Sequence, residues 1–133
     1  MSWNNQNISV VVIDDTQING QMVKDILKGS ICNVKYFSDP HDGLRELMIF
    51  KPDVVLLDLD MPELNGVEIL TQLRKMDSTT HQRVIMFTAH ADLETVEMIL
   101  KMKVEDYLVK PFKAVDLIRK LNHMFDRDIF QNT

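Results

Sequence analysis

The chain has 133 residues, which suits one domain, and a domain of this size buries about two thirds of its unfolded surface. A hydrophobic fraction of 45% and a net charge of −5 are ordinary for a globular protein and argue against a broad nucleic-acid-binding surface. No apolar run is long enough for a membrane span, and the single cysteine, Cys32, excludes an intrachain disulfide and a thiolate metal cluster. We therefore expect one domain, residues 1–133, in the reducing cytoplasm.

The first part of the chain reads as two strand–helix units. Residues 8–13 are an apolar run typical of a buried strand, and they end in Asp14-Asp15. A helical pattern follows and ends near Gly29, with a buried face predicted from Ile18, Met22, Ile26, Val23 and Leu27. Residues 34–37 indicate a short strand, and Ser38-Asp39-Pro40 is a helix-start signature. The apolar residues of that second helix are Leu44, Leu47 and Met48.

The rest of the chain repeats this alternation three times. Residues 54–57 are an apolar run between two prolines that predicts a strand buried on both faces, and the run leads directly into Asp58. The helix after it places Val67, Leu70 and Leu73 inward. Strands at 84–87 and 107–109 are followed by helices at 91–102 and 114–125. The pattern predicts an α/β fold with a parallel sheet, a core at about 8–126, and a tail or the start of a linker at 127–133.

Polar or charged side chains follow four of the five predicted strands, namely Asp14-Asp15, Asp58, Thr88 and Lys110. The strands of a parallel sheet all point the same way, so these residues should meet at the edge where open α/β sheets bind ligands. Three carboxylates repel one another unless a cation lies between them, and ligation by oxygen alone suits Mg²⁺. A divalent cation beside an acceptor carboxylate suits phosphoryl transfer, with Asp58 as the nucleophile and Lys110 and Thr88 holding phosphoryl oxygens.

The same residues belong to a set of four motifs, each of which closes a predicted strand. The motifs are Asp14-Asp15, Asp58-x-x-Met61-Pro62-x-x-Asn65-Gly66, Thr88-Ala89 and Lys110-Pro111-Phe112. In this order they resemble the receiver domain of two-component response regulators over about residues 8–126. The resemblance implies a flavodoxin-like, doubly wound sheet of five parallel strands in the order 2-1-3-4-5, with helices on both faces.

The resemblance implies that Asp58 is a phosphoacceptor. It would take a phosphoryl group from a phosphohistidine on a sensor histidine kinase or a histidine phosphotransfer protein. Mg²⁺ would be the cofactor, bound by Asp15, Asp58 and the backbone carbonyl of Asp60, with Asp14 helping through a water molecule. Lys110 would pair with the phosphoryl group. The expected function is therefore a signalling switch rather than a turnover enzyme.

A second implication concerns the response to phosphorylation. Thr88 would hydrogen-bond the phosphoryl group, and Tyr107 would then move inward as the switch aromatic. The face formed by the fourth helix, the fifth strand and the fifth helix would change its packing. That face would control an output domain or a downstream protein, or form a homodimer on phosphorylation. No direct contact with nucleic acid or membrane is expected of this chain.

Two departures from the family pattern affect these expectations. Met102-Lys103-Val104-Glu105 stands where the family often has a Gly-Ala pair, so bulkier residues are expected to change the loop after the fourth helix. Asp60 and His90 occupy positions two beyond Asp58 and Thr88. Side chains there influence how water reaches the aspartyl phosphate in the family, so we treat both residues as modulators of its lifetime.

Other interpretations compete with the receiver. An apolar run followed by Asp58-Leu59-Asp60 is similar to the opening motif of haloacid-dehalogenase-type phosphohydrolases, which also use Mg²⁺ and an aspartyl phosphate; Pro62 and the position of the Asp14-Asp15 pair oppose that interpretation. A receiver-like interaction module without phosphorylation is a second alternative. For single residues, Asp14, Asp15 and Thr88 are also suited to capping helices.

Overall fold

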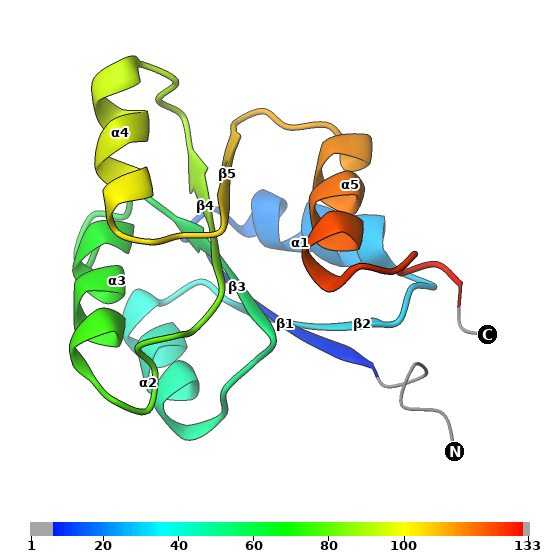
Figure 1. Ribbon diagram of the computed structural model, residues 1–133, viewed down its shortest axis with the longest axis horizontal. Helices are drawn as coiled ribbons and strands as arrows, with labels where there is room; N and C mark the ends of the chain where they lie inside the picture. Colours follow the sequence, from blue (N-terminus) through cyan, green and yellow to red (C-terminus); the bar gives the residue numbers. More distant parts are fainter. Residues whose placement is uncertain (1–6, 132–133) are drawn as a thin grey trace.

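The computed structural model describes residues 7–131, which form a parallel sheet with helices on both faces (Figure 1). The strand order is β2-β1-β3-β4-β5, and every neighbouring pair is parallel, which confirms the flavodoxin-like, doubly wound topology. The elements alternate along the chain as β1 (Ile8–Ile13), α1 (Gln17–Leu27), β2 (Cys32–Phe37), α2 (Pro40–Ile49), β3 (Val54–Asp58), α3 (Gly66–Lys75), β4 (Val84–Thr88), α4 (Leu93–Lys101), β5 (Asp106–Val109) and α5 (Ala114–Phe125).

Two apolar clusters hold the layers together, one on each face of the sheet. On one face α1 and α5 contribute Val23, Leu27, Leu117 and Leu121, and Figure 1 shows these two helices on the same side. On the other face the helical contributions are Leu47 from α2, Ile69, Leu70 and Leu73 from α3, and Ile99 from α4. The central strands β3 and β4 are buried at every residue, as expected of strands covered on both faces.

The register of the sheet brings the carboxyl ends of its strands to one edge. Ile13 pairs with Leu57, Asp58 with Phe87, and Thr88 with Val109. The residues that directly follow β1 and β5, and the last residues of β3 and β4, therefore lie close together. This confirms the arrangement that the chain order predicts for the polar residues.

Several helix details differ from the sequence prediction. Ile18 and Met48 were expected on buried or apolar faces, but they are 73% and 45% exposed. In α1 the buried residues are Gly20, Val23 and Leu27, so the buried stripe is centred on these positions rather than on Ile18, Met22 and Ile26. Gly20 faces the ring of Tyr36 closely enough to leave no room for a Cβ, and this contact fixes the rotation of α1.

Element ends also differ by one or two residues. The second strand begins at Cys32 rather than 34, and the fourth helix begins at Leu93 rather than 91, because Asp92 is its N-cap and accepts a hydrogen bond from the Thr95 amide. The second helix starts as predicted, with Asp39 as the N-cap and Pro40 in the first turn. Such shifts are common where local capping chemistry decides the boundary.

The segment after α5 packs against the domain instead of extending away from it. Ile129 is fully buried in the cluster of α1 and α5, and its carbonyl accepts a hydrogen bond of 2.8 Å from the Ile31 amide. Asn122 holds the same residue by accepting its amide hydrogen at 2.9 Å. Within the segment expected to be a tail or linker start, Ile129 is thus anchored to the domain, while Asp128, Phe130 and Gln131 are exposed; residues 132–133 lie outside the described residues.

Candidate functional site

Asp58 lies at the carboxyl end of β3 with its side chain buried, at 2% exposure. Its Oδ1 accepts hydrogen bonds from Lys110 Nζ at 2.9 Å and from the Asp60 amide at 3.2 Å. The turn after it returns tightly to α3, and a Cβ on Gly66 would lie 2.5 Å from the Asp58 carbonyl oxygen. Glycine at 66 is therefore required for the start of α3 to approach the strand end so closely.

Asp14 is fully buried beside Asp58 and is held by several donors. Its Oδ1 accepts the Thr16 amide at 2.9 Å, and its Oδ2 accepts Asn19 Nδ2 at 3.0 Å and lies 3.1 Å from Lys110 Nζ. The hydroxyl of Tyr36 donates to the Asp14 carbonyl at 2.7 Å. Asn19 and Tyr36 were not predicted as site residues, because nothing in the sequence indicates which polar side chains of α1 and β2 reach this edge.

Lys110 joins the two buried carboxylates. Burial raises the pKa of Asp58 to about 6, the negative charge of Asp14 adds to this shift, and the hydrogen bond from Lys110 opposes it. Burial alone would lower the pKa of Lys110, but its hydrogen bonds to Asp58 and Asp14 outweigh burial, so the pKa is raised. The site therefore holds two buried carboxylates and one ammonium group. The positive charge of Lys110 offsets the repulsion between the two carboxylates only in part.

Asp15 completes a group of three carboxylates. One oxygen from each of Asp14, Asp15 and Asp58 lies within 4.8 Å of the others, and Asp15 is exposed at the mouth of the group. Carboxylate oxygens without sulfur or imidazole are the donor set that Mg²⁺ prefers. Asp15 and Asp14 were also considered as helix caps, but α1 has Thr16 as its N-cap and no side-chain capping bond.

Thr88 lies at the same edge of the sheet, but its hydroxyl forms no hydrogen bond with Asp58. Its Oγ1 accepts a hydrogen bond of 2.9 Å from the His90 amide. The backbone of Thr88 is tied to β5, since its carbonyl accepts the Lys110 amide at 2.7 Å. The N-cap of α4 is Asp92, so the alternative that Thr88 serves as the cap of this helix is wrong.

Asp60 and His90 form a pair across the mouth of the site. His90 Nε2 lies 3.3 Å from Asp60 Oδ2, with both side chains about half exposed. The pair joins the loop after β3 to the loop after β4. Beside it is a small pocket of about 290 Å³ lined by Leu59, Asp60, Asn65, Val67, His90, Thr95 and Met98.

Tyr107 lies on β5 opposite Met86 of β4. It is half-buried against the cluster of α2, α3 and α4, in which Met102 and Val104 also pack. The loop that separates α4 from β5 is thus anchored by its apolar residues, next to the aromatic ring that was predicted to switch.

Arg74 of α3 holds this loop in place, a role that sequence patterns do not reveal. Its guanidinium donates to the carbonyls of Met102 at 3.2 Å, Lys103 at 3.0 Å, Thr80 at 3.2 Å and Gln82 at 2.9 Å. Lys103 has φ of 62°, in the left-handed region that glycine adopts without strain. The bonds from Arg74 therefore stabilise a lysine in a conformation where the family often has a Gly-Ala pair.

The arrangement of strands and acidic residues can be compared with known proteins. Residues 10–122 match the family described as response regulator receiver domain. The chain is 32% identical to chemotaxis protein CheY-3 of Vibrio cholerae over 126 residues, which are 92% of this chain and 95% of the relative. It is 29% identical to the DNA-binding response regulator MtrA of Mycobacterium tuberculosis over 119 residues, and it spans about half of that relative, at 51% of its length.

Solved structures show the same likeness. The receiver domain of sensor histidine kinase PA1611 from Pseudomonas aeruginosa, with a magnesium ion coordinated in the active site cleft, superposes with a TM-score of 0.78 and 25% identity, over 88% of this chain and 96% of that one. The match over 10–122 covers most of the chain, and the fold and strand order agree with it. The chain therefore belongs to the receiver domain family of two-component response regulators.

Proposed function

We propose that this domain is a phosphorylation-dependent switch and that Asp58 is its phosphoacceptor. The observation that carries the proposal is the buried Asp58 carboxylate, 2.9 Å from Lys110 Nζ and next to Asp14 and Asp15. A carboxylate oxygen of Asp58 attacks the phosphorus of a phosphohistidine, so that a P–O bond forms while the P–N bond breaks. The electron pair of the broken bond stays on the imidazole nitrogen, which then takes up a proton.

The residues present fit Mg²⁺. Asp15, Asp58 and the backbone carbonyl of Asp60 would hold the ion, and Asp14 would contact it through water, because both of its oxygens already accept hydrogen bonds. When bound, Mg²⁺ supplies positive charge that offsets the carboxylates and the oxygens of the transferred group. The magnesium in the PA1611 receiver supports this assignment, since that domain shares the fold at 25% identity.

Lys110 and Thr88 then act on the phosphorylated side chain. Lys110 already contacts Asp58 and would keep one phosphoryl oxygen as its partner. Thr88 would exchange the hydrogen bond of 3.4 Å that its hydroxyl donates to the His90 carbonyl for one donated to the phosphoryl group. This exchange would draw the β4–α4 loop inward and leave space for Tyr107, which shifts the face of α4, β5 and α5.

Asp60 and His90 are proposed as modulators of the lifetime of the phosphorylated state. Their side chains pair at 3.3 Å over the mouth of the site, where water must pass to reach the aspartyl phosphate. Substituting His90 by Ala would open this path and change the rate of hydrolysis without changing the capacity for phosphorylation. The decay of the phosphorylated form, followed by intact mass, measures that rate.

The proposal includes the partners and the setting of the domain. The donor is a histidine kinase or a histidine phosphotransfer protein, and the receiver, residues about 8–126, controls an output domain, a downstream protein or a homodimer. We place it in the cytoplasm, where ATP fuels such kinases. Receivers are signalling domains rather than turnover enzymes, so a haloacid-dehalogenase-type activity is not proposed. The relatives include a DNA-binding regulator, so the expectation of no nucleic-acid contact gains no support from them.

Intact-mass measurement tests the assignment of Asp58. The wild-type chain is incubated with a small phosphodonor such as acetyl phosphate, with and without Mg²⁺, beside Asp58→Asn and the matched control Asp60→Asn. We expect one phosphoryl group on the wild type and on Asp60→Asn only with Mg²⁺, and none on Asp58→Asn. Equal labelling of Asp58→Asn would overturn the proposal, and labelling without Mg²⁺ would overturn the metal requirement.

A further inference from the structure

A second site lies at the opposite edge of the sheet from Asp58. Helices α3 and α4 run antiparallel to the strands, so their carboxyl ends meet at that edge, beside a pocket of about 380 Å³. We call it the basic pocket, and its lining residues are Thr71, Arg74, Lys75, Thr80, His81, Lys101, Met102 and Lys103. The lining contains four cationic side chains and an imidazole, and no acidic side chain, in a chain whose net charge is −5.

Favourable interactions with helix ends explain only some of the basic residues that line this pocket. Lys75 and Lys101 are the last residues of α3 and α4, where a cation is favoured by the helix dipole. Lys103 and His81 lie in loops beyond the helices. Among the described residues, Lys75, Lys101 and Lys103 have no ion pair, whereas Lys35, Lys110 and Lys120 each pair with a carboxylate. Three ammonium groups without an anion therefore border one pocket.

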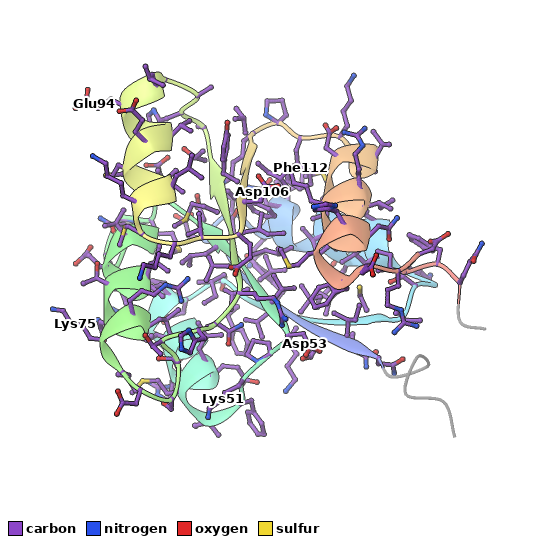
Figure 2. The ribbon with its side chains drawn as sticks, viewed as in Figure 1. Lys51, Asp53, Lys75, Glu94, Asp106 and Phe112 are labelled. Carbon is purple, nitrogen blue, oxygen red and sulfur yellow. The ribbon has the colours of Figure 1, made fainter. Side chains whose placement is uncertain are left out.

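The surrounding acidic residues leave this charge largely unbalanced. Glu94 lies at the other, N-terminal end of α4, while Lys75 projects from the outer side of α3, as Figure 2 shows. Glu97 precedes Lys101 by one turn of α4, and Asp77 follows Lys75 by two residues, but neither lines the pocket. The charge of Glu105 acts on Arg74, but its carboxylate accepts the Val84 amide at 2.8 Å and does not line the pocket either. Several like charges around a concave surface raise the local concentration of an anion.

The hydrogen bonds of Arg74 define which anion fits. Its guanidinium donates to four backbone carbonyls, so its planar fork is not available for the paired contacts that select a carboxylate. The remaining cations are ammonium groups, which bind phosphate oxygens as point charges. A pocket of about 380 Å³ lies within the size range of small-ligand sites.

We propose that the basic pocket binds a small anion with two or more linked phosphate groups. Lys75, Lys101 and Lys103 would contact its oxygens, and Arg74 would position the loop that carries Lys103. The ligand would lie on the α4–β5 loop, which precedes Tyr107 in the chain. The site does not depend on phosphorylation of Asp58, so its test is independent of the proposed function.

The experiment is a titration of the whole ¹⁵N-labelled chain with pyrophosphate, at low ionic strength and without Mg²⁺, followed by two-dimensional NMR. We expect saturable shifts of amides at residues 71–75, 80–81 and 101–104, with a Kd of about 1 mM or tighter. ATP, as a second probe, shows whether a nucleotide is preferred: tighter binding than pyrophosphate indicates a nucleotide, and equal binding indicates the phosphates alone.

Two double variants carry the same change of charge. Lys101→Gln with Lys103→Gln should weaken pyrophosphate binding about tenfold or more, because two ammonium groups at the pocket are lost. Lys24→Gln with Lys28→Gln, at the end of α1, should change it less than about twofold, since only the net charge differs. Equal weakening in both variants, shifts that do not saturate, or binding of hexaglutamate in place of pyrophosphate would each overturn the proposal.

Discussion

Helices α3 and α4 cover the same face of the sheet but are attached to it very differently. In α3 the residues Ile69, Leu70 and Leu73 are fully buried, together with Gly66 at its start. In α4 only Ile99 is buried, while Leu93, Met98 and Leu100 are 73%, 41% and 50% exposed. Burial of an apolar side chain is worth about 1.5–3 kcal/mol, so α3 is anchored several times more strongly than α4.

The difference matches the two halves of the site. The strongly anchored α3 begins against the Asp58 backbone, and it fixes the loop that carries Asp60. The weakly anchored α4 follows Thr88, whose hydroxyl contacts only the His90 backbone, accepting from its amide at 2.9 Å and donating to its carbonyl at 3.4 Å. Chemistry at a carboxylate needs a fixed geometry, whereas a response needs an element that moves at low cost. Under the proposed function, each of these two properties belongs to a different helix.

Truncating one leucine in each helix should give the largest contrast. Leu73→Ala removes a fully buried side chain of α3 and is expected to lower the free energy of unfolding by about 2–5 kcal/mol. Leu100→Ala in α4 removes a half-exposed side chain and should change it by less than about 0.5 kcal/mol. Urea unfolding at constant pH measures both. A loss of similar size in the two variants would contradict the difference in anchoring.

The buried charge of Asp58 should lower the stability of the folded domain near neutral pH. The folded pKa of Asp58, about 6, lies above its ordinary value of 3.8, so folding favours the protonated carboxyl. This contribution to stability is fully present below about pH 4 and is lost as the pH rises through about 6. Near pH 7.5 without Mg²⁺, Asp58→Asn should therefore be more stable than the wild type by about 1–3 kcal/mol. A pKa shift of one unit corresponds to about 1.4 kcal/mol of stability. The weaker hydrogen bond between Lys110 and the asparagine offsets part of the gain.

Urea unfolding of both proteins across pH checks this prediction. The advantage of Asp58→Asn should shrink as the pH falls through about 6 and should vanish below the ordinary pKa of 3.8, where the wild-type carboxyl is protonated in both states. Mg²⁺ should stabilise the wild type more than the variant, because it offsets the same charge crowding. An advantage that is independent of pH would mean that burial of the charge is not its cause.

The parallel α/β class and the charged centre of the site were predictable from the sequence because each depends on a local signal, whereas the strand order came from the family resemblance. Val54–Asp58 is an apolar run that ends in a carboxylate, and the βα alternation fixes the edge at which such ends meet. The Asp39-Pro40 helix start was also predictable, since a capping side chain and a proline act within one turn.

The parts that were not predicted depend on contacts between distant segments. Ile18 follows the helical period of α1 but is exposed, because the contact of Gly20 with Tyr36 sets the rotation of that helix. Ile129 lies beyond the last periodic helix, yet it is buried against α1 and α5. Arg74 donates across 28 and 29 residues to the α4–β5 loop, a pairing that has no sequence signal without known neighbours.

Arg74 connects α3 to the α4–β5 loop through hydrogen bonds. Arg74→Met keeps a long apolar stem but removes the donors to the carbonyls of Met102, Lys103, Thr80 and Gln82. We expect the free energy of unfolding to fall by about 1–2 kcal/mol, because these carbonyls lose charged donors and regain only part of the loss by hydrogen-bonding with water. Amide exchange at 102–105 should accelerate more than that of β3. Lys75→Met, one residue further on the exposed side of α3, serves as the control and should leave both quantities nearly unchanged.

The caps of the two helices give the smallest contrast and the most specific one. Asn65 and Glu68 form a reciprocal capping box at the start of α3, with bonds of 2.9 and 3.1 Å, and Asp92 caps α4 through the Thr95 amide at 3.0 Å. Asn65→Ala should lower the free energy of unfolding by about 1 kcal/mol, because α3 unfolds only with the whole domain. Asp92→Ala should instead fray the first turn of α4 and accelerate amide exchange at residues 93–96, with global unfolding unchanged. If Asp92→Ala lowered the free energy of unfolding as much as Asn65→Ala does, α4 would unfold in the same cooperative unit as α3. That result would contradict the inference that α4 is weakly anchored and moves independently of α3.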